Sequence, residues 1–161
     1  MEKRIGFDID DVFSVIPFYY LRTKFNLDYF LSRCSLTEGY IRRFLYRRRR
    51  VNSEMIRLIN RLSEKCYIVL VTAAPEQFRE EVSSWLLKNR IPYNALHLWK
   101  RNGSIEEFKL RVIQVENLDY YLDDRLKIIR FLKEKENFFN CQIIHYRGQS
   151  ALELEKMLKM V

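Results

Sequence analysis

The stretch KRIGFDIDDVF, residues 3–13, decides how the rest of the chain is interpreted. In it a short apolar run ends in three carboxylates, Asp8, Asp10 and Asp11, within four residues. Strand side chains alternate with a period of two, so Asp8 and Asp10 are expected to leave the strand end on the same side. Two carboxylates held that close repel each other, and we therefore expect a hard divalent cation with oxygen ligands between them, Mg²⁺ before Ca²⁺. Taken alone, the pattern is also typical of an acidic turn that closes a strand.

A second apolar run, YIVLV at residues 67–71, is followed by Thr72, two alanines and Pro75. Such a run beside a helical pattern predicts a buried parallel strand. Thr72 supplies a hydroxyl there, and the following loop supplies backbone N–H groups at the start of the next helix. Together they form a natural seat for a phosphate. An ordinary helix N-cap is the alternative interpretation of Thr72.

A third apolar run, near residues 118–122, ends in the adjacent carboxylates Asp123 and Asp124. Lys109 lies on a predicted helix, fourteen residues before Asp123. Each feature has a simple structural explanation when taken alone. The acidic pair suits a strand-to-helix turn, and the lysine suits an exposed helix surface.

The order of the predicted elements favours an α/β fold. Strands alternating with helices form a parallel sheet, here of about five strands, with helices on both faces. Open sheets of this kind bind ligands at the carboxyl ends of their strands, where all the polar motifs fall. The expected strands after the first are 67–71, 95–99, 119–122 and 141–146, and the expected helices are 53–64, 76–88, 105–116, 126–135 and 149–160.

Together and in this order, the features resemble the motifs of the haloacid dehalogenase-like (HAD) hydrolases. These motifs are DxDxV after the first strand, a threonine after the second, a lysine on a helix and an acidic pair after a later strand. The finer pattern is most similar to the 5′(3′)-deoxyribonucleotidase-like branch of that superfamily. It consists of FDIDDV, VTAxPEQFRE, WLxxxxIPY and YYLDDR.

The resemblance implies a Rossmann-like core and a Mg²⁺-dependent phosphatase that works through an aspartyl-phosphate. Asp8 is then the nucleophile, and Asp10 is the acid that protonates the leaving oxygen and later the base that activates water. The Asp8 carboxylate, the Asp10 backbone carbonyl and Asp123 are the expected Mg²⁺ ligands. Asp124 is expected to orient that ligand shell.

The same resemblance assigns phosphate binding to Thr72, the Ala73 N–H and Lys109. Two positions depart from the common pattern of the superfamily. Asp11 stands where glycine is frequent, although aspartate occurs there in the nucleotidase-like branch. Ala74 stands where relatives with a TARP pattern carry arginine, so a positive group is missing and the substrate is affected more than the reaction.

Residues 14–50 form an insert between the first two motifs, where the resemblance places a small helical cap. The expected organisation is one domain, 1–161, with core 1–13 and 51–161 and a cap insert 14–50. The insert carries six arginines within residues 42–50. Arg42, Arg43, Arg47 and Tyr19 are candidate substrate contacts. A solvated helix face, a nucleic-acid surface and a homodimer surface remain alternative roles for the arginines.

Composition limits the remaining classes. At 161 residues and 48% hydrophobic content the chain is long enough for a sizeable core, and its net charge of +8 favours anionic partners. No apolar run reaches the roughly 20 residues of a membrane helix. The scattered cysteines Cys34, Cys66 and Cys141 lack the spacing of a metal site and suit reduced thiols, so we expect a cytoplasmic protein without a membrane partner.

The sequence therefore favours a Mg²⁺-dependent phosphomonoester hydrolase that acts on a small phosphorylated metabolite such as a nucleoside monophosphate. A phosphatase on nucleic-acid ends that uses the arginine-rich insert is one alternative. A non-catalytic binding protein that keeps the HAD-like fold is the other. The two histidines, His97 and His145, are interpreted as packed strand residues.

Overall fold

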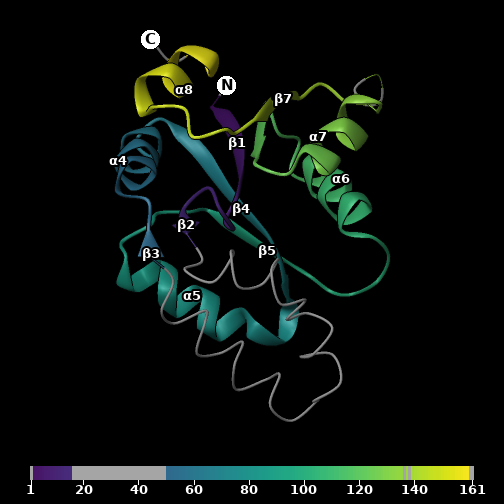
Figure 1. Ribbon diagram of the computed structural model, residues 1–161, viewed down its shortest axis with the longest axis horizontal. Helices are drawn as coiled ribbons and strands as arrows, with labels where there is room; N and C mark the ends of the chain where they lie inside the picture. Colours follow the sequence, from purple (N-terminus) through teal and green to yellow (C-terminus); the bar gives the residue numbers. More distant parts are fainter. Residues whose placement is uncertain (1, 16–49, 136, 138, 160–161) are drawn as a thin grey trace, which may run out of the picture.

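The computed structural model describes residues 2–15, 50–135, 137 and 139–159. Five parallel strands form one sheet in the order β5-β4-β1-β6-β7 (Figure 1). The predicted α/β fold with a five-stranded parallel sheet is therefore confirmed. The strands are β1 (Lys3–Asp8), β4 (Cys66–Pro75), β5 (Ala95–Trp99), β6 (Tyr120–Asp123) and β7 (Gln142–His145).

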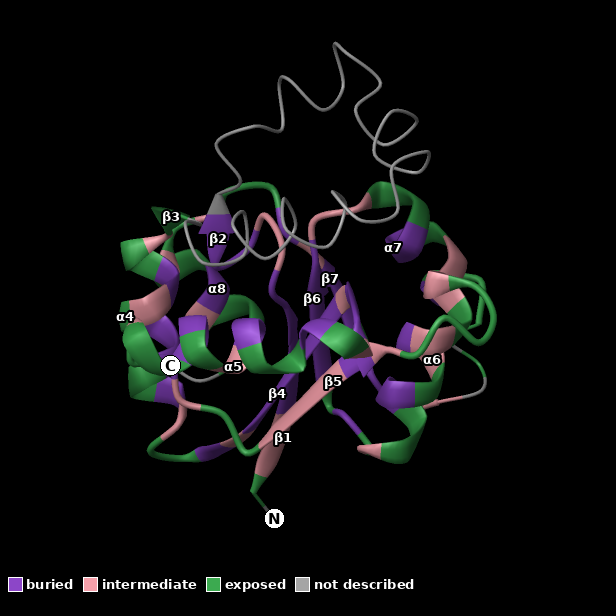
Figure 2. Ribbon diagram, turned by 90° about the horizontal axis from the view of Figure 1, so that it is seen from below, coloured by how far each residue is buried: buried purple, intermediate pink, exposed green. Residues whose placement is uncertain are grey.

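Helices cover both faces of this sheet. Helices α4, α5 and α8 lie on one side of the strands and α6 and α7 on the other (Figure 1). The central strands are buried, and the outer faces of the helices are exposed (Figure 2). The helices are α4 (Ser53–Leu62), α5 (Arg79–Lys88), α6 (Ile105–Val115), α7 (Leu126–Lys133) and α8 (Ala151–Met157).

Successive strand residues point to opposite faces, so the strands contribute side chains to two separate apolar cores. The core beneath α4, α5 and α8 includes Ile5, Phe7, Ile68, Leu70, Leu122 and Ile144. The core beneath α6 and α7 includes Val69, Val71, Tyr121 and Ile143. The near-continuous apolar runs of the sequence are thus strands buried on both sides.

Gly6 shows how tightly the second core packs against the central strand. A Cβ at this position would lie 2.4 Å from Leu118 Cδ1 and 2.8 Å from Tyr121 Cδ2. The missing side chain is therefore what lets the Tyr121 ring lie against β1.

Polar side chains cap the helices that frame the site. Ser104 begins α6 with a capping box, in which its hydroxyl accepts a hydrogen bond from the Glu107 N–H and the Glu107 carboxylate accepts one from the Ser104 N–H. Ser150 and Glu153 form the same arrangement at α8, and the Asn52 side chain caps α4. These caps satisfy N–H groups that the first helical turn leaves without partners.

Strand β4 runs further than the predicted 67–71. It continues to Pro75, with a register shift against β5 between Thr72 and Pro75, and a short 3₁₀ helix (Glu76–Phe78) precedes α5. The expected helix 76–88 therefore begins as a 3₁₀ turn and becomes α-helical at Arg79, and Thr72 lies in the strand and not at a helix N-cap. The bulge arises because Pro75 pairs with Trp99 while Thr72 pairs with Leu98, which leaves Ala73 and Ala74 outside the pairing.

The insert is attached through a short antiparallel ladder between β2 (Ser14–Val15) and β3 (Arg50–Val51). Asn52 ties the ladder to the core, because its N–H donates to the Phe13 carbonyl and its side-chain amide donates to Tyr146 Oη. The predicted cap helices and the residues Tyr19, Arg42, Arg43 and Arg47 lie outside the described residues. Their roles stay predictions.

Among the described residues, no helix combines the length and apolar character needed to cross a lipid bilayer. Cys66 and Cys141 are buried in different cores, on opposite faces of the sheet. Cys34 lies outside the described residues.

Candidate active site

The carboxyl ends of three adjacent strands bring the predicted polar residues together. Asp8 ends β1, Thr72 lies near the end of β4, and Asp123 ends β6. Strand β1 is central, with β4 on one side and β6 on the other. The chain moves outward from β1 to β4 and β5, then crosses back to β6, so the site lies at the switch point of the sheet, where α/β folds bind ligands.

Lys109 joins two of these carboxylates. From α6 its Nζ donates one hydrogen bond to Asp8 Oδ1 and one to Asp123 Oδ2, each 2.5 Å long. All three side chains are fully buried. An ammonium removed from water in this way needs close counter-charges, and the two carboxylates supply them. The structure thus brings Asp8, Lys109 and Asp123, which are far apart in the sequence, into direct contact.

The Asp8 carboxylate is buried away from water and lies close to other carboxylates. Burial raises the pKa of Asp8 well above its ordinary value, Lys109 opposes this rise, and Asp123 and Asp10 add to it. Asp8 Oδ2 has no hydrogen-bond partner among the described residues. One oxygen of this carboxylate is therefore held by Lys109, and the other is available to a ligand or a metal.

Asp10 is held by the second strand. The Thr72 hydroxyl donates to Asp10 Oδ2 at 2.9 Å and accepts a hydrogen bond from the Ala74 N–H at 3.0 Å. The bulge in β4 aims this N–H back at the threonine. The Thr72 hydroxyl thus orients Asp10 in addition to its predicted role at the phosphate. Ala73, its expected companion, lies in the bulge outside the strand pairing.

Asp11 takes a backbone conformation that explains its departure from the common glycine. Its φ is 57°, in the left-handed region, and its N–H donates to the Ser14 carbonyl. Glycine adopts this conformation freely, and aspartate is one of the few other residues that tolerate it. The turn after Asp10 is therefore formed without glycine.

The structure adds two residues that the sequence analysis missed. Tyr121 Oη donates to Asp123 Oδ2, and the Arg125 N–H donates to Asp123 Oδ1. The Arg125 guanidinium also lies near this carboxylate, with Nε 3.9 Å from Asp123 Oδ1. The signal for Tyr121 was its position two residues before Asp123, on the same face of a strand. Arg125 carried no comparable signal, because an arginine at a helix start is usually exposed.

Arg125 is electrostatically coupled to the whole site. Burial alone would lower the pKa of its guanidinium, but the nearby carboxylates of Asp8, Asp123 and Asp10 raise that pKa above its ordinary value. Arg125 remains fully charged and lowers the pKa of Asp8 in return. Arg125 therefore places a positive charge in a site where position 74 is alanine and supplies none.

Asp124 lies beside the buried pair. Burial raises its pKa to about 6, and the charges of Asp123 and Asp11 contribute to the rise. The backbone carbonyl of Asp124 accepts a hydrogen bond from His145 Nε2 at 2.9 Å, and His145 Nδ1 accepts one from Arg147 Nε. His145 therefore supports the strand end that carries the acidic pair.

The second histidine stands apart from this cluster. His97 Nε2 lies 2.7 Å from Oε1 of Glu116, the residue that follows α6, and the same glutamate binds Arg4. This contact links β5 to the far end of α6.

The described residues fit a divalent cation. Carboxylate oxygens of Asp8, Asp123 and Asp124 lie within 4.8 Å of one another. Such a set of oxygen donors suits Mg²⁺, which prefers carboxylates together with water and substrate oxygens. Burial raises the pKa of Asp8 and of Asp124, and a cation bound there would favour the ionised forms of both.

The charge balance of the cluster supports this fit. Among the described residues, the carboxylates of the cluster outnumber its cationic side chains, so negative charge remains when all are ionised: Asp8, Asp10, Asp11, Asp123 and Asp124 against Lys109 and Arg125. A divalent cation would offset part of this charge.

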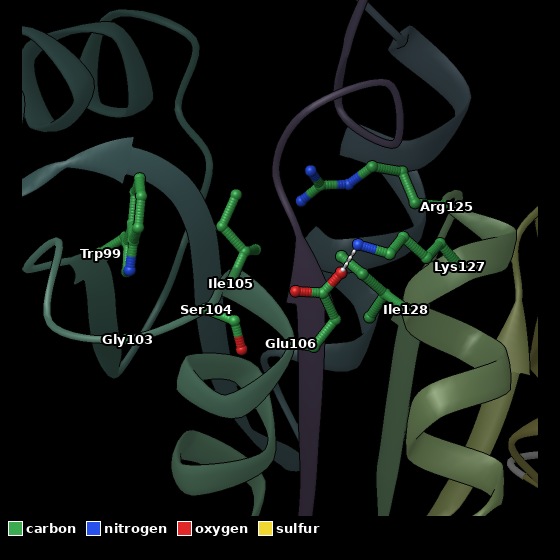
Figure 3. Close-up of a pocket in the computed structure, with 8 residues that line it drawn as sticks. All are labelled: Trp99, Gly103, Ser104, Ile105, Glu106, Arg125, Lys127 and Ile128. Carbon is green, nitrogen blue, oxygen red and sulfur yellow. Dashed lines mark ion pairs between the residues drawn. The ribbon is translucent and has the colours of Figure 1, made fainter.

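A pocket of about 430 Å³ opens beside this cluster. It lies between the loop that follows β5 and the first turns of α6 and α7 (Figure 3). Trp99 and Ile105 stand on one side, and Arg125 and Lys127 reach in from the other. Lys127 is paired with Glu106 at 2.7 Å, whereas Arg125 extends toward the centre. Arg125 thus connects the pocket to Asp123.

No protein-family model matches the sequence, and no curated protein shows significant similarity to it. Solved structures do match the fold. A hydrolase described as a haloacid dehalogenase-like family protein from Streptococcus pneumoniae superposes with a TM-score of 0.66 at 10% identity, over 98% of both chains. An L-2-haloacid dehalogenase superposes with a TM-score of 0.63 at 8% identity, over the full length of both. The chain has a haloacid dehalogenase-like fold.

A third match comes from a longer chain. A chain in a structure of the Pnkp1/Rnl/Hen1 RNA repair complex superposes with a TM-score of 0.63 at 13% identity, over 91% of this chain and 42% of that one. The present chain therefore spans less than half the length of that match. At these identities the likeness establishes the fold alone.

Proposed function

We propose that the protein is a Mg²⁺-dependent phosphomonoester hydrolase that forms an aspartyl-phosphate on Asp8. The observation that carries this proposal is the buried contact of Lys109 with Asp8 and Asp123 at the carboxyl edge of the sheet. Burying three charged side chains carries a desolvation cost, so such a cluster is more readily explained by a chemical role than by stability. A pre-positioned nucleophile beside a fixed cation is what phosphoryl transfer requires.

The residues divide the reaction between them. An Asp8 carboxylate oxygen attacks phosphorus and forms the P–O bond of an acyl phosphate, while the P–O bond to the leaving group breaks. Asp10 gives its proton to the departing oxygen. Asp10 then takes a proton from water as that water attacks phosphorus, which releases inorganic phosphate and restores Asp8. Thr72 holds Asp10 in place through their hydrogen bond during both proton transfers.

Lys109 and the backbone share the stabilisation of charge. Lys109 fixes one Asp8 oxygen, so the other is presented to phosphorus. A divalent ion held by Asp8 and Asp123, with Asp124 beside it, would neutralise phosphoryl oxygens and lower the barrier to attack. The Ala73 N–H in the β4 bulge is the proposed donor to a further phosphate oxygen.

The test is phosphate release from nucleoside monophosphates, sugar phosphates and a 5′-phosphorylated oligonucleotide, with Mg²⁺ and with EDTA. We expect Mg²⁺-dependent turnover of at least one class and its loss in Asp8→Asn. A matched control is Asp119→Asn, which removes a carboxylate at the opposite end of the sheet, where it binds the Arg4 N–H. Folded protein that binds Mg²⁺ but releases no phosphate from any substrate would favour the non-catalytic alternative.

A phosphatase on nucleic-acid ends is the second candidate. Two observations favour it: the fold match to a chain of an RNA repair complex and the six arginines within residues 42–50. Binding of an oligonucleotide through several arginines would weaken steeply as salt rises. In the substrate panel this candidate predicts that the 5′-phosphorylated oligonucleotide is preferred and that the preference falls with added salt. A preference for mononucleotides that is insensitive to salt contradicts it.

A further inference from the structure

The two oxygens of the Asp123 carboxylate are used unequally. An ionised carboxylate offers about four acceptor sites, shared between its oxygens. Asp123 Oδ2 accepts a hydrogen bond from Lys109 Nζ at 2.5 Å and another from Tyr121 Oη at 3.0 Å. Asp123 Oδ1 accepts one from the Arg125 N–H at 2.9 Å, while Arg125 Nε, at 3.9 Å, lies beyond hydrogen-bond distance. Donors among the described residues therefore fill Oδ2 and leave an acceptor site open on Oδ1.

Tyr121 reaches Asp123 because of its place in the sheet. It lies two residues before Asp123 on β6, so both side chains are on the face of the sheet that α6 and α7 cover. Two residues of a strand span about 6.6 Å, which a tyrosine side chain covers when its ring lies along the strand. Gly6, the partner of Tyr121 on β1, leaves space for that ring, since a Cβ there would lie 2.8 Å from Tyr121 Cδ2. Packing at Gly6 thus holds the hydroxyl at Asp123 Oδ2.

Asp8 also presents a single oxygen. Its Oδ1 accepts a hydrogen bond from Lys109 Nζ, and its Oδ2 has no hydrogen-bond partner among the described residues. Lys109 therefore takes one oxygen of each carboxylate, and Tyr121 takes the second acceptor site on the Asp123 oxygen. Binding of a cation by both oxygens of Asp123 is then blocked, whereas binding by Oδ1 alone is open.

Single oxygens favour one class of divalent cation. Mg²⁺ requires near-ideal octahedral geometry and combines one or two carboxylates with water, whereas Ca²⁺ takes about six to eight oxygen ligands and accepts both oxygens of one carboxylate. Tyr121 suits this arrangement because its phenol is a neutral donor at physiological pH. It fills an acceptor site without adding a positive charge that would repel the metal.

We propose that Tyr121 is a positioning residue that makes the carboxylate cluster selective for Mg²⁺ over Ca²⁺. It acts through Asp123, by filling Oδ2 and leaving Oδ1 as the single oxygen for the cation. Without the hydroxyl, Asp123 is less firmly oriented, and both of its oxygens become available to a larger ion. This role rests on the phosphatase function proposed above and assigns the selectivity of the same site.

Cation binding can be measured without turnover. Thermal unfolding of the wild type and Tyr121→Phe is followed in EDTA and over a series of MgCl₂ or CaCl₂ concentrations at constant ionic strength. The rise in stability with cation concentration gives each dissociation constant, separately from the stability of the metal-free fold. Tyr121→Phe keeps the ring that packs against Gly6 and removes only the hydroxyl.

The two cations should respond differently to this substitution. We expect the dissociation constant for Mg²⁺ to rise about tenfold and that for Ca²⁺ by about threefold at most, so the preference for Mg²⁺ shrinks. A general loosening of the fold would weaken both alike. Equal changes for the two cations, or no change for either, overturn the proposal. So does wild-type protein that Mg²⁺ stabilises no more than Ca²⁺ does.

Tyr146→Phe is the matched control. It also removes a tyrosine hydroxyl from a hydrogen bond, the contact with Asn52 Nδ2 at 3.0 Å, which lies at the base of the insert. Both dissociation constants should stay at their wild-type values, even where the metal-free protein loses stability. A loss of Mg²⁺ preference equal to that in Tyr121→Phe would trace the effect to stability and would also overturn the proposal.

Activity provides an independent measurement. With any substrate that is hydrolysed, Tyr121→Phe should raise the Mg²⁺ concentration that gives half the maximal rate by the same factor as the dissociation constant, and an unchanged concentration contradicts the assigned role. Failure of the underlying function is recognised separately, as wild-type protein that prefers Mg²⁺ to Ca²⁺ in the unfolding series but releases no phosphate from any substrate.

Discussion

Replacing Lys109 by methionine removes the charge that holds the two buried carboxylates while keeping a side chain of similar length. Lys109, Asp8 and Asp123 are fully buried, and both hydrogen bonds measure 2.5 Å. Removing one partner of a buried ion pair costs about 3–5 kcal/mol, because the remaining charge has no counter-charge. With a typical slope of about 2 kcal/mol per M, the urea midpoint at neutral pH should fall by about 2 M.

The loss should depend on pH in a defined direction. Burial and Asp123 raise the pKa of Asp8, and Lys109 opposes the rise, so removing Lys109 raises this pKa further. A carboxyl whose pKa is higher in the folded state binds more protons there, and its contribution to stability is present at low pH and lost as pH rises. In Lys109→Met, protonating Asp8 removes a buried charge that has no counter-charge and so stabilises the variant. In the wild type, protonating Asp8 removes one of the two carboxylates that pair with Lys109. The difference between the two proteins should therefore shrink toward pH 4.

The assay is urea unfolding followed by circular dichroism from pH 4 to pH 8 in EDTA, repeated with Mg²⁺. Lys127→Met is the matched control, because Lys127 pairs with Glu106 but its side chain is 87% exposed. Such a surface pair contributes about 0–1 kcal/mol. Added Mg²⁺ should return part of the lost stability to Lys109→Met. Equal midpoints for Lys109→Met and the wild type at pH 7, or a difference that does not change with pH, would refute the reasoning.

Three further predictions concern neighbouring groups. Because the pKa of Asp124 is raised to about 6, its contribution to stability in EDTA should fall as pH rises from about 4 to 6, and Asp124→Asn should flatten this part of the profile of urea midpoint against pH. Thr72→Val should destabilise the fold by about 1–3 kcal/mol, since the Ala74 N–H loses its acceptor, and should lower kcat because Asp10 loses its donor; Thr72→Ser should retain both, as checked by unfolding and phosphate release. Gly6→Ala should cost about 1–3 kcal/mol, measured by thermal unfolding, because its Cβ would meet Leu118 and Tyr121; a variant as stable as the wild type would mean that this packing is looser than described.

The sequence predicted the parts of the site that depend on strand ends. Asp8, Thr72 and Asp123 each follow an apolar run, and parallel strands align their carboxyl ends, so their meeting follows from topology. Lys109 could be placed on α6 through the resemblance, although its full burial could not be foreseen from a single lysine. Tyr121 was accessible in principle through the two-residue period of its strand.

Other features depend on contacts that a linear pattern does not encode. The bulge at Ala73 and Ala74 arises from the register of β4 against β5, which comes from a separate segment. Arg125 is drawn inward by carboxylates from β1 and β6, so its role appears only when those strands are adjacent. The left-handed conformation of Asp11 depends on its hydrogen bond to Ser14.

The β2–β3 ladder has a consequence for how such a molecule can diversify. Ser14 pairs with Val51 and Val15 with Arg50, so the chain leaves the core and returns to it through neighbouring points. For a segment with fixed ends, the entropic cost of closure grows only logarithmically, by about 0.6 kcal/mol for each doubling of length. Residues 16–49 can therefore be shortened, extended or exchanged between proteins while the carboxylates stay in place. Chimeras joined at residues 15 and 50 offer a way to recombine recognition elements with an unchanged chemical centre.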